Sequence, residues 1–248
     1  IQTLKVVKGE EQEKGFEEEY VISMVFLFLL YMTLILYGQT IMRSIIEEKT
    51  SRIVEVLLSS ANSFQLLMGK LLGVGSVGLV QYVLWSVLAS VGFIIGTASV
   101  PNLSDVFSIS PMIMFYFILF FIIGYFTFST LYAAAASLSS DMQDMQSLSM
   151  IVTILVIIPF VVSFAIVRNP TSDLSQVLSF IPFFTPLLMF MRISLVTPPL
   201  WEILLAIGIN LVTIVGIIWL SARIFRIGIL MTGKRPTLPE VIRWVRYR

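Results

Sequence analysis

The sequence predicts an all-α polytopic membrane protein with five transmembrane helices and one re-entrant segment. Apolar residues make up 57% of the 248 positions, charged residues make up 12%, and the mean hydropathy is +0.95. A soluble domain is about a quarter charged and at most about half apolar. The apolar excess is more than one water-soluble core can bury, so it implies lipid as the solvent. Five uncharged stretches also reach the roughly 20 residues that a helix needs to cross a bilayer.

The missing residue types exclude several kinds of chemistry. The chain has no cysteine and no histidine, which removes disulfides, thiolate nucleophiles, zinc sites with the usual ligands and histidine acid–base catalysis. It has no phosphate-binding loop of the form G-x-x-x-x-G-K-[ST], so ATP hydrolysis would have to occur in another polypeptide. A net charge of +1 gives no reason to expect nucleic acid as a partner. We expect no catalytic residue, no metal site and no cofactor in this chain.

The chain is expected to begin with a linker. Residues 1–19 hold six glutamates between Glu10 and Glu19 and no periodic apolar stripe, which is typical of a solvated run of charge. We interpret this segment as an external linker at the end of an absent extracellular domain, followed by a transmembrane domain over 20–226. The predicted spans are Tyr20–Met42, Leu71 to about Gly96, Pro111 to about Ser137, Leu148–Val167 and Ile203–Ala222.

Two of these spans carry local features. Around the start of the second, Gly69, Gly73, Gly75 and Gly78 occur at spacings that let helix backbones approach closely. The fourth contains Pro159, which a membrane helix tolerates as a kink when neighbours satisfy the freed carbonyl.

Between the fourth and fifth spans lies an apolar stretch that is too short to cross. Phe180–Met191 is interrupted by Pro182 and Pro186. Two prolines at membrane depth need a site lined by protein, so we expect an external re-entrant segment within 168–200. A hydrophobic loop lying on the membrane surface is the alternative.

The distribution of positive charge predicts the orientation. Eleven of the sixteen Lys and Arg residues fall in the 43–70 loop and the C-terminal region, and five fall on the other side. The richer side is expected to be cytoplasmic, which puts the tail, residues 227–248, inside the cell and residue 1 outside. Five crossings from an external start leave an N-terminal helix unaccounted for, so we expect the chain to be part of a longer subunit.

The 43–70 segment is expected to leave the membrane and return to it. Its apolar residues fall on one helical face, and acidic and basic residues occupy much of the remainder. The pattern breaks at 59–62, where Asn62 with Gln65, or Ser60 with Ser63, could cap the next helix. An interfacial helix in the headgroups is the alternative, but such helices are rich in Lys and Arg. The mixed charge favours contact with a cytoplasmic protein. The apolar face consists of Ile46, Ile53, Val54, Leu57 and Leu58.

The spans themselves contain no Asp, Glu, Lys or Arg. Ion-coupled transporters and pumps usually place such residues in the membrane, so their absence favours an external source of energy. The neutral polar residues in the spans, such as Gln39, Gln81 and Asn210, are expected mainly to join helices by hydrogen bonds.

Three stretches of the sequence resemble one family of transporters. The first is EEKTSRIVEVLLSS at 47–60 followed by LLMGKLLG at 66–73, the second is PFFTP at 182–186 with Met189 and Arg192, and the third is GKRPTL at 233–238. They are similar to the coupling region, the external segment before the last helix and the C-terminal ending of ABC type-2 permeases. The similarity is greatest to the sodium-extruding branch. This sequence departs from many relatives, which have Gly-Thr at 51–52 and Pro at 61.

The resemblance implies a six-helix subunit with a large external domain between its first two helices, of which this chain would be the C-terminal part. It also implies a second permease subunit, alike or different, and a separate ABC ATP-binding subunit that carries ATP-Mg. The residues that would bind this ATPase are Glu47, Glu48, Lys49, Arg52, Glu55, Leu57, Leu58, Ser59 and Ser60. Those of the external re-entrant segment are Pro182, Phe183, Thr185, Pro186 and Arg192.

We therefore expect a non-enzymatic permease subunit in the cell membrane, surrounded by lipid, that exports its cargo when a partner hydrolyses ATP. Sodium is the cargo implied by the resemblance, and a lipid, a peptide or a drug is the alternative. A membrane scaffold or assembly subunit that transports nothing is a further alternative. A membrane-embedded enzyme is disfavoured, because this sequence lacks the histidines and the buried carboxylate pair that its chemistry would need.

Overall fold

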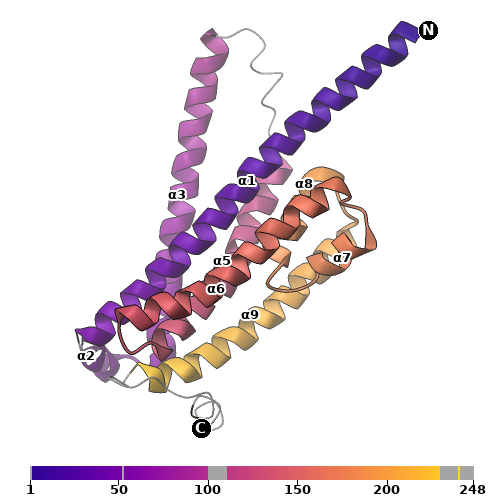
Figure 1. Ribbon diagram of the computed structural model, residues 1–248. Coiled ribbons are helices and arrows are strands. Elements are labelled where there is room, and N and C mark those ends of the chain that lie inside the picture. Colours follow the sequence, from indigo (N-terminus) through magenta and orange to yellow (C-terminus); the bar gives the residue numbers. More distant parts are fainter. Residues whose placement is uncertain (1, 52, 100–110, 230–239, 241–248) are drawn as a thin grey trace.

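The computed structural model describes residues 2–51, 53–99, 111–229 and 240, with side chains described from Tyr20 onward except at some helical positions of α2 and α3. The part of the chain so described is helical, with no strand (Figure 1). The tail motif at 233–238 and Arg52 lie outside these residues. The helices are α1 (Gln2–Thr50), α2 (Ile53–Ser60), α3 (Ser63–Ser99), α5 (Pro111–Leu138), α6 (Met142–Arg168), α7 (Asp173–Ser179), α8 (Thr185–Val196) and α9 (Leu200–Gly228).

Five of these helices are long and apolar enough to cross a membrane, which confirms the predicted fold class. They cover Tyr20–Thr50, Ser63–Gly92, Pro111–Leu138, Met142–Arg168 and Leu200–Gly228. Each extends beyond at least one end of the apolar stretch that predicted it, because a helix can continue past the hydrocarbon into water or headgroups. α6 runs through Pro159 without ending. α1 begins at Gln2, so the segment expected to be a linker is helical; its place outside the membrane stays a prediction.

α5 is the central helix of the bundle. It packs most extensively against α1 and α9, and also contacts α6, α8 and α3. Its buried aromatic residues, including Phe120, Phe121, Tyr125 and Phe128, form much of the core. α3 lies at the margin, as Figure 1 shows, and Val77, Val80 and Val83 leave its outer face apolar and exposed.

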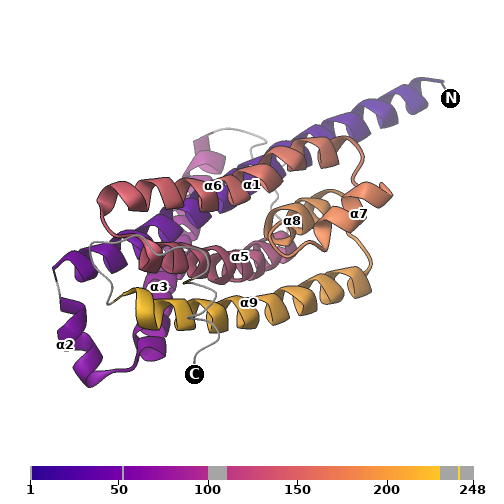
Figure 2. The same ribbon diagram turned by 60° about the horizontal axis from the view of Figure 1, so that its bottom comes forward.

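The bundle has two distinct ends. The C-termini of α1, α5 and α9 and the N-termini of α3 and α6 meet at the end where α2 lies, which we call the α2 end (Figures 1 and 2). The short helices α7 and α8 connect the C-terminus of α6 to the N-terminus of α9 at the opposite end, which we call the α8 end. The segment expected to dock a partner and the segment expected to be re-entrant therefore belong to opposite halves of the molecule.

Candidate functional site

α2 is a short amphipathic helix at the edge of the α2 end. The predicted continuation of α1 ends at Thr50, Ser51 is a turn residue, and α2 begins at Ile53. Val54 is buried, Leu57 and Leu58 are half-buried, and Ile53 and Val56 are 52% and 70% exposed. One side of α2 therefore anchors the helix, while two apolar side chains face away from the bundle. Figure 2 shows α2 projecting beyond the other helices at this end.

The turn from α2 to α3 is fixed by a reciprocal capping box. The backbone N–H of Gln65 donates to Oδ1 of Asn62 at 2.9 Å, and the backbone N–H of Asn62 donates to Oε1 of Gln65 at 3.0 Å. This arrangement satisfies donors that the start of a helix leaves unpaired. The Asn62–Gln65 alternative predicted from the sequence is confirmed.

The polar and charged residues expected to bind the ATPase differ in their burial and in their contacts. Glu47 is exposed, as are Ser59 and Ser60. Glu48 is partly buried and forms an ion pair with Lys70 of α3, whose ammonium also donates to Oγ of Ser44. Glu48 thus joins α1 to α3. The side chain of Glu55, like Arg52, is outside the described part of the chain.

Lys49, one of the residues expected to bind the ATPase, is internal. The residue is only 4% exposed. Its ammonium donates to the carbonyl oxygens of Ser137 at 3.0 Å, Ser139 at 2.8 Å and Gly228 at 2.7 Å. All three acceptors are main-chain atoms at the C-terminal ends of α5 and α9. Because Lys49 is buried, we leave it out of the docking surface proposed below.

A hollow of about 950 Å³ adjoins α2. It lies between the α2–α3 turn, the first turns of α3 and the last turns of α9. Leu58, Ala61 and Phe64 line it on one side, and Trp219 and Arg223 on the other. The guanidinium of Arg223 lies 4.0 Å from the centre of the Trp219 ring. The half-buried Leu58 of α2 therefore forms part of the wall of a recess.

The predicted re-entrant segment reaches the middle of the bundle. A Cβ added to Gly124 would lie 3.0 Å from Cβ of Pro186 and 3.0 Å from Cδ2 of Leu34. Gly124 is the midpoint of α5, so the first turn of α8 lies at half the depth of that helix. From there α8 returns over 12 residues, about 18 Å. Thr185 and Pro186 are fully packed, whereas Pro182 and Phe183 are half-buried in the turn before them.

Arg192 is held in a buried polar network between α7, α8 and α9. Its Nη2 donates to Glu202 Oε2 at 2.9 Å and its Nε donates to the carbonyl of Pro170 at 3.1 Å, and Gln176 donates to Glu202 Oε1 at 2.8 Å. The side chains of Arg192 and Glu202 are 5% and 7% exposed. Glu202 lies in the first turn of α9, where the helix dipole favours a negative charge. The network joins α8 to α7 and to the first turn of α9 at the α8 end.

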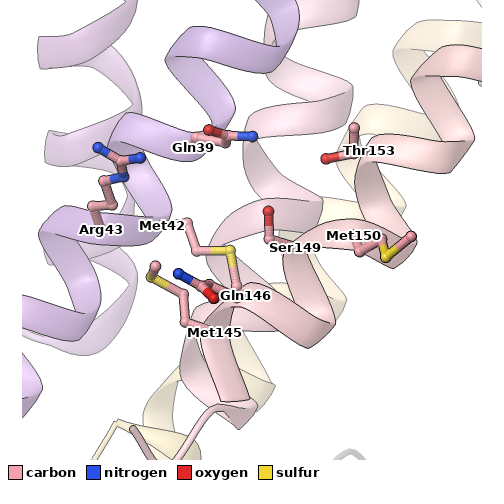
Figure 3. A pocket seen from close by; sticks show the side chains of 8 residues that line it. All are labelled: Gln39, Met42, Arg43, Met145, Gln146, Ser149, Met150 and Thr153. Carbon is pink, nitrogen blue, oxygen red and sulfur yellow. The ribbon is translucent and has the colours of Figure 1, made fainter. Parts of the chain in front are cut away.

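A smaller cavity of about 300 Å³ lies between α1 and α6 in the half of the bundle near the α2 end (Figure 3). Gln39, Met42 and Arg43 line it from α1. The α6 side combines methionines with amide and hydroxyl groups, and Figure 3 shows the two sets on facing helices. The α6 residues are Met145, Gln146, Ser149, Met150 and Thr153. Within the described residues, no group of three or more Asp, Glu, His or Cys side chains could hold a metal ion.

Sequence reasoning missed two of these features. Glu202 was not singled out, although a lone carboxylate three residues after Pro199 and before an apolar span is a signal for the first turn of a helix. The burial of Lys49 has no comparable local signal, because its acceptors come from distant helices. Gln39 was named among the neutral polar residues of the spans, but nothing in its spacing, or in that of Arg43, pairs it with α6.

Comparisons with known proteins identify the family. Residues 2–223 match the family described as ABC-2 family transporter protein. The chain is 32% identical to the uncharacterized protein YhaP of Bacillus subtilis over 91% of its length, and 35% identical to the uncharacterized protein MJ1024 of Methanocaldococcus jannaschii over 93%. It spans 55% and 56% of those relatives. No solved structure matches it significantly, and the matches give no particular support to the sodium-extruding branch. With five long apolar helices and a match over most of its length, the chain is a multi-pass membrane protein that belongs to the ABC-2 family of transporter proteins.

Proposed function

We propose that this chain is the permease part of an ATP-driven exporter, and that a separate ATP-binding subunit docks on α2. The observation that carries the proposal is the outward exposure of Ile53 and Val56 on a helix whose other side is anchored by Val54. A helix made to lie on anionic headgroups has a polar face rich in Lys and Arg, and α2 contains neither. A protein partner therefore fits α2 better than a lipid surface does.

The family supports the same partner. ABC-2 permeases generally pair with ATP-binding subunits, and this sequence has no phosphate-binding loop of its own. ATP-Mg would then be bound by the partner. ATP-driven movement of that subunit would displace α2 and tilt the attached helices, which would open the permease alternately to the two sides. A second permease subunit, alike or different, would complete the pathway.

The orientation belongs to this proposal. Arg43, Lys70, Arg223 and Arg226 lie at or near the α2 end, and the positive-inside rule supports a cytoplasmic position for that end. The ATPase would meet α2 from the cytoplasm of a cell whose plasma membrane holds the bundle.

Sodium and an organic solute are the two candidate cargoes. Sodium follows from the sequence resemblance. The α1–α6 cavity favours the second, because methionine side chains adapt to varied apolar shapes and Arg43 contributes a positive charge with no carboxylate in the lining. The cavity thus fits an amphipathic solute with a negative or polar group, such as a lipid, a peptide or a drug.

Docking is tested by co-purification. The affinity-tagged protein is purified from its own host's membranes, and the retained ATP-binding subunit is measured for wild type and for Ile53→Glu/Val56→Glu. We expect the double variant to lose the subunit, because two carboxylates would replace the apolar contact. Gln143→Glu is the matched control, since Gln143 is exposed in the first turn of α6 at the same end. Equal retention by all three proteins would overturn the docking proposal.

The cargo is tested in sealed vesicles that contain the purified complex. Sodium movement and movement of a fluorescent anionic amphiphile are followed after adding ATP. An organic cargo predicts ATP-dependent movement of the amphiphile that Arg43→Gln weakens, whereas sodium movement alone would select the sodium exporter. A well-folded complex that moves no solute would favour the scaffold alternative.

A further inference from the structure

Lys49 is a buried cation whose contacts play no part in the docking of the ATP-binding subunit. A lysine ammonium has three protons, and here each reaches a different backbone carbonyl at 2.7–3.0 Å. Its hydrogen-bond partners in the described structure include no carboxylate. Burying an ammonium away from water is costly unless the site supplies compensating hydrogen bonds. The last carbonyls of a helix lack partners within that helix and carry the negative end of its dipole, so the ends of α5 and α9 provide that compensation.

The two helix ends are also in direct backbone contact. A Cβ added to Gly228 would lie 2.5 Å from the carbonyl oxygen of Ser137 and 3.0 Å from its carbonyl carbon. Glycine is therefore required at 228 for α9 to approach α5 this closely. The Lys49 ammonium thus binds a pair of helix ends that already touch, and it joins three helices at one point.

The position of Lys49 along the chain places these three hydrogen bonds next to α2. Lys49 is the penultimate residue of α1, and α2 begins four residues later. The sizeable contacts of α2 are with α1 and α3. A displacement of α2 therefore reaches the rest of the bundle through the end of α1 or through the capped start of α3. Only the first of these routes passes Lys49.

We propose that Lys49 is a positioning residue that transmits movement of α2 to the cytoplasmic ends of α5 and α9. The inference rests on the proposed function, since the movement comes from the docked ATPase. When α2 is displaced, the end of α1 moves with it, and the three hydrogen bonds transmit this displacement to α5 and α9. Without them, α1 can shift while α5 and α9 keep their places. Arginine is no substitute, because its planar guanidinium cannot direct three donors as an ammonium does.

The absence of cysteine from the chain makes a direct test practical. Gln143→Cys on α6 and Arg226→Cys on α9 place two spin labels at exposed positions of the α2 end. The distance between the labels is measured in the complex with its ATP-binding subunit, with and without trapped ATP. We expect ATP to change this distance in the otherwise wild-type protein. In Lys49→Met, the ratio of molecules that change to molecules that do not should fall by about two- to thirtyfold, the range expected for a residue on a coupling route.

Three controls separate transmission from a purely structural role. Lys70→Met removes the lysine that joins α1 to α3 through Glu48 and Ser44, and should leave the distance change in place. Lys49→Arg should behave like Lys49→Met. Gly228→Ala keeps the lysine but forces α9 away from Ser137, and should reproduce the loss even where Lys49→Met folds poorly.

The outcomes distinguish the two proposals. Failure of the wild type to retain any ATPase overturns the proposed function and the inference with it. If the ATPase is retained and hydrolyses ATP, then an unchanged distance response in Lys49→Met and Gly228→Ala overturns the inference alone. If ATP does not change the α6–α9 distance in the wild type, the inference alone is likewise overturned.

Discussion

The hydroxyl of Tyr125 on α5 donates a hydrogen bond of 2.7 Å to the backbone carbonyl of Leu71 on α3. The ring of Tyr125 lies over Gly75, where an added Cβ would be 2.7 Å from its Cε1 atom. This contact attaches the marginal helix α3 to the centre of the bundle.

Gly75→Ala is expected to destabilise the protein by about 1–3 kcal/mol, because the added methyl group overpacks against the Tyr125 ring. Thermal unfolding in detergent measures the change. Gly73→Ala is the matched control on the same helix, since its Cβ would meet no atom within 4 Å. Equal melting temperatures for the two variants would contradict the packing of α3 against Tyr125.

Loss of both partners of the Arg192–Glu202 pair is expected to cost less than the two single losses added together. Arg192→Met or Glu202→Gln alone should cost about 3–5 kcal/mol, because the remaining charge is buried without its partner. The double variant should cost less than the sum of the single changes. A double-mutant cycle on the unfolding free energy gives the coupling, and additive effects would show that the pair does not interact in the membrane.

Gly124→Val is expected to displace the first turn of α8 from the middle of α5. The new side chain would press on Pro186 and Leu34, at a cost of about 1–3 kcal/mol, and should raise proteolysis of the 180–186 turn. Gly216→Val is the comparison, because Gly216 on α9 faces open space. A surface loop at 180–191 would instead leave Gly124→Val as stable as this control.

Asn62→Ala is expected to fray the start of α3, with a loss of about 1 kcal/mol typical of an N-cap. Gln65→Ala should add little to it, because both side chains serve the same capping box. Hydrogen exchange at the first amides of α3 measures the fraying. Ser60→Ala tests the alternative cap, and a larger effect there than at Asn62 would reverse the assignment.

The long helices could be predicted because an uncharged apolar stretch of sufficient length has few other solutions in lipid. Their ends depend on polar residues that hydropathy does not weigh. α6 begins at Met142, six residues before the predicted span, because Asp141 caps it by accepting a hydrogen bond of 2.8 Å from the Asp144 N–H. The helical course of residues 2–19 was missed because a charged run without an apolar stripe carries no signal of packing.

The candidate site was only partly accessible to sequence reasoning, and the reason is sequence distance. The capping box spans three residues and was found. Lys49 meets carbonyls 88, 90 and 179 residues away, and main-chain acceptors leave no residue type to recognise. Spacing likewise named four glycines near the start of α3, but only Gly75 and Gly78 approach a neighbour, while Gly69 and Gly73 face open space. Spacing shows where a helix can be approached, and tertiary packing decides whether it is.

The main-chain oxygens around Lys49 also determine which substitutions would be tolerated during evolution at this junction of α1, α5 and α9. Because every residue type supplies the same carbonyl, substitutions at 137 and 139 leave the acceptors in place. The requirement falls instead on the cation at 49 and on the absence of a side chain at 228. In homologous chains the junction would therefore be recorded as a covarying lysine and glycine, separated by 179 positions, with variable residues at the carbonyls between them.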